Sequence, residues 1–119
     1  MRPTAEVGWP VAIEEGHAVL RADQGIVGLA VPLGMAESVA ADLVTVPVIA
    51  LPEDPPRWIF LAETPAGRCP DLPVGVGLFS GLSRIPLPPT RNTSWVREPV
   101  NGRVPSFMTL LRVVRAHDR

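Results

Sequence analysis

Apolar residues recur along this chain in short runs separated by prolines and glycines, a pattern that predicts many short strands. Residues 26–31 are apolar almost throughout, as expected of a central strand covered on both faces. Weaker runs predict strands at residues 7–13, 17–21, 46–51, 58–62, 74–79, 85–87 and 94–100. Asn101-Gly102 is a strong hairpin-turn signal between the last of these runs and Arg103-Val104.

Two segments have helical rather than strand spacing. In residues 35–44 the larger apolar side chains fall at i, i+4 and i+8, namely Met35, Val39 and Leu43. A second helix is predicted over residues 107–116 with Ser106 as N-cap. Its apolar positions i, i+3, i+4 and i+7 are Phe107, Leu110, Leu111 and Val114. We therefore expect an α+β fold of RRM-like character, a mostly antiparallel sheet of short strands backed by these two helices.

Composition bounds the class of protein. The chain has 119 residues, 46% of them apolar, which fits one domain over residues 1–119 with a modest core. Cys69 is alone, so neither an intramolecular disulfide nor a cysteine-based zinc site is expected. No signal peptide or membrane-length apolar stretch is recognisable, and we expect a cytoplasmic protein.

Charge is divided unevenly along the chain. Residues 1–83 carry ten acids against four arginines, a local net of −6. Residues 84–119 carry seven arginines against two acids, a local net of +5. Clustered guanidinium groups attract anions and bind phosphate oxygens in pairs, so the asymmetry indicates an anionic partner, most commonly nucleic acid. The alternative is a solvated arginine-rich face with no ligand.

The chain lacks a self-sufficient catalytic motif. It has no Asp-x-Asp, Asp-x-Glu or Glu-x-Glu pair that would hold two metal ions from one strand. His17 and His117 both fit ordinary surface positions, and Ser80 is one place too late for a nucleophile elbow. No catalytic residue, metal or cofactor is therefore predicted, although an unrecognised enzymatic site stays open.

The candidate contacts lie in the C-terminal third. We predict that five arginines contact phosphates and that one tryptophan stacks on a base, with single strands favoured: Arg84, Arg91, Arg97, Arg112, Arg115 and Trp95. Packing of Trp95 in the core is the competing interpretation. A different class of function is also open, a protein–protein interaction module that meets an acidic protein surface or another copy of the chain.

The order of elements resembles the N-terminal domain of actinobacterial bifunctional DNA primase/polymerases (prim-pol). Four segments carry the resemblance: Gly8-Trp9-Pro10-Val11; residues 26–34 before a helix; Arg57-Trp58-Ile59-Phe60-Leu61; and Leu87-Pro88-Pro89-Thr90 followed by Trp95 and Val104-Pro105. The resemblance implies a role in replication and DNA binding.

The catalytic residues of that family are missing here. The resemblance implies acids on the first core strand and a histidine on the later strand. Residues 25–34 contain no carboxylate, and Trp58 occupies the histidine position. Without these acids Mg²⁺ has no ligands at that place. The resemblance thus implies a catalytically silent relative that keeps the arginines facing nucleic acid.

Overall fold

The structure is a computed structural model that describes residues 11–14, 16–21, 25–52, 55–65, 67, 71–80, 83–88, 92–99 and 104–118. Trp9, Cys69, Arg91 and the Asn101-Gly102 turn lie outside the described residues. Within the described part, eight strands and two helices form an α+β fold, as the sequence predicts.

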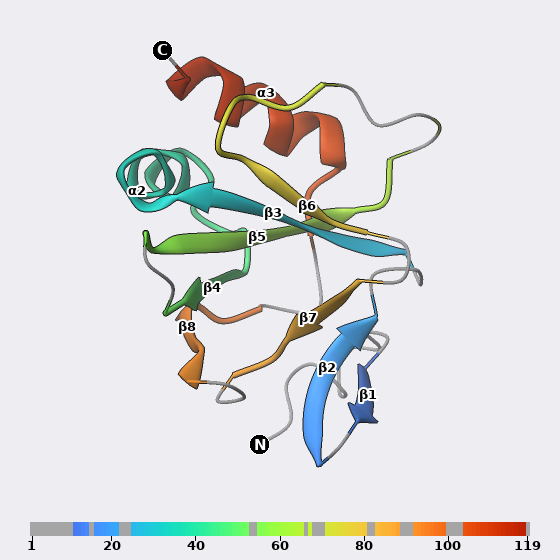
Figure 1. The fold of residues 1–119 in the computed structure, drawn as a ribbon. Coiled ribbons are helices and arrows are strands. Elements are labelled where there is room, and N and C mark those ends of the chain that lie inside the picture. Colours follow the sequence, from blue (N-terminus) through green and yellow to red (C-terminus); the bar gives the residue numbers. More distant parts are fainter. Residues whose placement is uncertain are drawn as a thin grey trace.

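The larger sheet has five strands, and every neighbouring pair is antiparallel (Figure 1). Its order is β6-β3-β5-β4-β8. The bounds are β3 (Ile26–Pro32), β4 (Val48–Leu51), β5 (Arg57–Glu63), β6 (Gly77–Phe79) and β8 (Ser94–Arg97). β3 and β5 pair along their whole length. The prediction for residues 26–31 is confirmed, because all six are buried in the interior of this sheet.

Both helices cover one face of this sheet (Figure 1). They are α2 (Leu33–Asp42) and α3 (Phe107–His117). The predicted buried face of α3 is confirmed, because Phe107, Leu110, Leu111 and Val114 are at most 1% exposed. The predicted N-cap is also confirmed, since the Ser106 hydroxyl oxygen accepts a hydrogen bond from the Thr109 N–H at 3.2 Å. In the described part of the chain, neither helix is long and apolar enough to cross a lipid bilayer.

Helix α2 begins and ends two residues earlier than the predicted span of 35–44. Its N-cap position is taken by Pro32, the last residue of β3, so the strand enters the helix without an intervening loop. At the other end, Leu43 leaves the helical region with φ −117° and ψ 76°. The sequence therefore predicted this helix correctly but placed both of its ends two residues too late.

Three further strands form a second sheet, rather than joining the single sheet that the sequence led us to expect. They are β1 (Val11–Glu14), β2 (His17–Arg21) and β7 (Arg84–Pro86), in the order β1-β2-β7. This sheet packs on the face of the larger sheet opposite the helices, where Leu20 and Ile85 are fully buried. Hydrophobic periodicity gives the existence of a strand but not its partner, and β2 pairs with a strand far along the chain.

Several other strands are shorter than predicted. β4 begins at Val48 rather than at residue 46, directly after Pro47, which has no N–H to donate to a neighbouring strand. β6 begins at Gly77 rather than at residue 74, after Gly75 with φ +87°. Gly77–Phe79 is therefore only a short edge of the larger sheet.

The two sheets approach each other closely at Gly28. A Cβ atom on this residue would lie 2.7 Å from the Ile59 Cγ2 atom and 2.9 Å from the Ile85 Cδ1 atom. Ile59 belongs to β5 and Ile85 to β7, and both are fully buried. The absence of a side chain at position 28 is what allows β7 to pack directly on β3.

Gly28→Val is expected to lower the free energy of unfolding by about 1–3 kcal/mol, because the added atoms overpack the contact between the sheets. Urea denaturation of the variant measures this loss. Gly34→Ala is the matched control, since a Cβ there meets nothing within 4 Å, and it is expected to leave stability unchanged or slightly raised. A Gly28→Val protein as stable as the wild type would contradict the proposed packing.

Candidate nucleic-acid interface

The five candidate residues that the structure describes lie in three separate parts of the molecule. Arg112 and Arg115 are on α3, above the larger sheet, and Trp95 and Arg97 are on the edge strand β8. Arg84 is on β7 in the second sheet, on the other side of the larger one (Figure 1). Arg91 lies outside the described residues. The described candidates therefore do not form one continuous face.

Trp95 and Arg97 face opposite sides of the larger sheet because β8 changes register between them. Trp95 is opposite Ile49, whereas Arg97 is opposite Val48, with an irregularity between these two pairs. Ile49 belongs to the cluster against the second sheet and Val48 to the cluster under the helices. Residues two apart on a regular strand would share a face. Arg97 therefore cannot support a base stacked on Trp95.

Trp95 is half-buried and packs against the hydrophobic cluster between the two sheets. That cluster contains Ile49, Leu51 and Leu87 among its buried members. Trp95 is therefore packed in the core in part, which is the competing interpretation that the sequence left open. A tryptophan in this position stabilises the contact between the larger sheet and the chain that follows β7.

Arg97 binds the C-terminal end of α2. Its Nη2 donates to the Ala40 carbonyl at 2.9 Å, and its Nη1 donates to the carbonyls of Val46, at 3.3 Å, and of Leu43. Carbonyls at a helix C-terminus have no partner within the helix and carry partial negative charge. The last turn of α2 has no basic residue of its own. The Arg97 guanidinium, half-buried, therefore has a structural role that the sequence pattern did not indicate.

Arg84 joins strands of the second sheet. Its Nε donates to the Glu14 Oε2 atom at 2.8 Å, which links β7 to β1. The two side chains are 32% and 43% exposed, so water and salt screen the attraction and this ion pair contributes little stability.

Arg112 and Arg115 are both exposed, one turn apart on α3. Met108, which is 49% exposed, lies one turn before Arg112 on the same stripe. The Nη2 atom of Arg115 donates to the Asp71 carbonyl at 2.7 Å, which orients this guanidinium. No acidic residue occurs between Phe107 and His117. Of the predicted contacts among the described residues, this pair is the one that the structure brings together on an exposed helix face.

The larger sheet has no open face in the part of the chain that the structure describes. The helices cover one side, and the second sheet covers the other, with Ala30, Ile59 and Leu61 fully buried beneath it. An RRM stacks bases on aromatic side chains of an exposed sheet face. That mode of binding is not available here.

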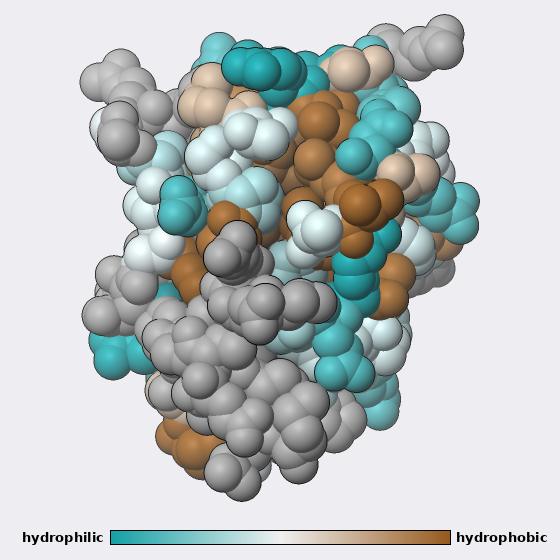
Figure 2. Space-filling view, turned by 180° about the vertical axis from the view of Figure 1, so that it is seen from behind, coloured by the Kyte–Doolittle hydropathy of each residue, from teal (hydrophilic) through white to brown (hydrophobic). Residues whose placement is uncertain are grey.

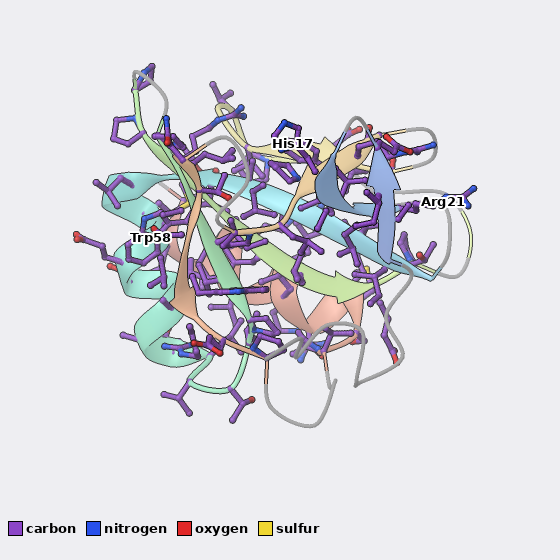
Figure 3. The ribbon with its side chains drawn as sticks, turned by 90° about the horizontal axis from the view of Figure 1, so that it is seen from below. His17, Arg21 and Trp58 are labelled. Carbon is purple, nitrogen blue, oxygen red and sulfur yellow. The ribbon has the colours of Figure 1, made fainter. Side chains whose placement is uncertain are left out.

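The histidines lie apart from the position where the resemblance implies catalysis. His17 is exposed on β2 with Arg21, away from Trp58 beside α2 (Figure 3). His117 lies 2.7 Å from the Asp42 carboxylate, measured from Nε2 to Oδ2, and so joins the ends of α3 and α2. Among the described residues, no group of three or more His, Cys, Asp or Glu side chains is close enough to hold a metal ion.

Comparison of the chain with protein-family models, with curated proteins and with solved structures finds no match. The resemblance to prim-pol domains stays a prediction from the segments quoted above.

Proposed function

We propose that this chain is a non-catalytic nucleic-acid-binding domain, related to prim-pol proteins, that contacts phosphates through the exposed face of α3. We define the α3 face as Met108, Thr109, Arg112, Arg115 and Ala116, all of which are exposed. The proposal draws on three independent features: the basic C-terminal third, the resemblance to prim-pol domains, and the position of two arginines on this face.

The observation that carries the proposal is the pair Arg112 and Arg115 on a helix without carboxylates. Each guanidinium can donate two parallel hydrogen bonds to a phosphate. Neither residue is needed for the core, since the opposite side of α3 supplies the buried contacts. Arg97 and Arg84 are left out of the proposal because the first binds α2 and the second pairs with Glu14.

Two phosphate contacts are fewer than the sequence alone led us to expect. Because the candidates are spread over three parts of the molecule, the described arginines that remain for one ligand are Arg112 and Arg115. Figure 2 shows that, on the face seen from behind, hydrophobic side chains lie among hydrophilic ones in the described part. Binding is therefore expected to be weak and to depend only modestly on salt, because few counterions are released.

The double variant Arg112→Gln with Arg115→Gln is expected to weaken binding to labelled oligonucleotides at least tenfold at about 50 mM salt, evenly across sequences. Fluorescence anisotropy measures the affinity. Arg21→Gln is the control, because it removes one arginine charge from β2, on the side of the molecule away from α3 (Figure 1). Thermal melts check that each variant folds. Equal affinity for the wild type and the double variant would refute the role of the α3 face.

A second candidate function is a protein–protein interaction module at the β8 edge. β8 is the last strand of the larger sheet, and Val96 on it is 40% exposed. Val44 is 67% exposed, and it follows Leu43, whose carbonyl binds Arg97 of the same edge strand. Exposed apolar residues on and near the last strand of the sheet, as far as the structure describes it, favour contact with another protein. A wild type that binds no oligonucleotide but elutes as an oligomer in size-exclusion chromatography would favour this candidate.

A further inference from the structure

We infer that the ligand of the α3 face is double-stranded DNA rather than the single strand that the sequence favoured. This inference rests on the proposed function and names the class of nucleic acid that the same surface takes. It follows from two observations. The first is the position of the aromatic rings, and the second is the convex shape of the helix surface that carries the arginines.

The described aromatic rings do not form a stacking platform. Phe60 and Phe107 are at most 1% exposed, and Trp58, Phe79 and Trp95 are half-buried and pack against the two core clusters. Proteins that bind single strands without sequence preference stack successive bases on aromatic side chains along a basic groove. The aromatic rings in the described part of the chain stabilise the core instead.

The arginines lie on a convex surface, a helix that is supported from below by the larger sheet. Eleven residues give α3 a length of about 16 Å at 1.5 Å per residue. The major groove of B-form DNA, about 12 Å wide, admits a helix, and its borders are lined with phosphates. A helix that carries arginines and no acids presents the charge that such a groove attracts.

The composition of the α3 face agrees with contact to a duplex. Thr109 and Ala116 are small, and Met108 is flexible, so the backbone of α3 can approach the ligand closely on either side of the two arginines. Arg115 is already oriented by the Asp71 carbonyl, which reduces the entropy lost when it binds a phosphate. A-form RNA has a deep, narrow major groove that excludes a helix, which favours DNA over RNA.

Two carboxylates limit how far the ligand contact can extend toward the carboxyl-terminal end of α3. Asp118 follows α3 directly, and Asp71 is exposed beside Arg115. Both carboxylates repel phosphates, so the contact is expected to end at Arg115 and to extend from there over Arg112 and the turn before it. This places the ligand along the middle of α3.

The test compares labelled probes of one sequence at about 50 mM salt: the DNA duplex, each DNA single strand, and the RNA duplex. The DNA duplex is expected to bind about tenfold more tightly than the other probes, because it combines a wide groove with a high phosphate density. Arg112→Gln with Arg115→Gln is expected to remove that advantage. Arg112→Lys with Arg115→Lys, which keeps both charges, is expected to retain most of it.

The outcomes separate the inference from the proposed function. If single strands bind as tightly as the duplex and the double glutamine variant loses this binding, the α3 face binds nucleic acid but the inference is wrong. The inference is also wrong if the wild type binds single strands more tightly than the duplex and Trp95→Leu abolishes that single-strand binding. A thermal melt must show that this variant is folded. The result would support stacking of a base on Trp95. If the wild type binds no probe, the proposed function and the inference both fall.

Discussion

A chain that ends before Ser106 is expected not to fold cooperatively, because it lacks α3, one of the two helices that cover one face of the larger sheet. Phe107, Leu110, Leu111 and Val114 are buried against residues of β3 and β5. Their loss would expose Val27, Leu29 and Phe60, which are at most 1% exposed in the intact protein. Burial of large apolar side chains contributes about 1.5–3 kcal/mol each, so the four side chains of α3 together are comparable to the whole stability of an ordinary domain.

A single substitution in α3 measures how much its packing on the larger sheet contributes to the free energy of unfolding. Leu110→Ala is expected to lower the free energy of unfolding by about 2–5 kcal/mol, through lost burial and the cavity left behind. Met108→Ala on the exposed side of α3 is the control, with an expected change of less than about 0.5 kcal/mol. Urea denaturation followed by circular dichroism gives both values. A truncated chain that keeps a sigmoidal transition at the wild-type midpoint would show that α3 is not part of the core.

Arg97→Met is expected to lower the free energy of unfolding by about 2–3 kcal/mol. The substitution keeps an unbranched apolar side chain but removes the donors to the carbonyls of Ala40, Leu43 and Val46. Hydrogen bonds to charged groups contribute about 1.5–3 kcal/mol, and carbonyls at a helix C-terminus depend on such partners. The loss is expected to appear as fraying of α2 and weakened pairing between β4 and β8, which hydrogen exchange resolves by element.

Two further variants separate geometry from charge at this position. Arg97→Lys keeps the charge but cannot fork over three carbonyls, so an intermediate loss is expected. Arg112→Met removes an exposed arginine of the same type and is expected to change stability by less than about 0.5 kcal/mol. If Arg97→Met melts with the wild type, the guanidinium is not a cap of α2, and its assignment to phosphate contact regains support.

The features predicted correctly from sequence are those set by neighbours along the chain. The buried stripe of α3 follows from 3.6-residue periodicity, and its start follows from the Ser106 cap. The interior position of β3 follows from an uninterrupted apolar run. In each case the determining residues lie within one or two turns, or within one strand.

The features that escaped prediction depend on residues distant in sequence. Arg97 binds carbonyls more than fifty positions away, and no local motif marks such a cap. The second sheet forms because β2 pairs with β7, and Gly28 leaves the space for that packing. The irregularity in β8, which sends Trp95 and Arg97 to opposite faces, depends on pairing with β4. A count of arginines in the C-terminal third therefore overstated the number available to one ligand.

The most direct test of the central claim is the salt dependence of duplex DNA binding, compared between the wild type and Arg112→Gln with Arg115→Gln. Each phosphate neutralised on B-form DNA contributes a log–log slope of about −0.9, so two contacts predict a wild-type slope no shallower than about −1.8. The double variant is expected to flatten the slope by about 1.8, while Arg21→Gln leaves it unchanged. The same slope in the wild type and the double variant would contradict the claim that α3 contacts the phosphates.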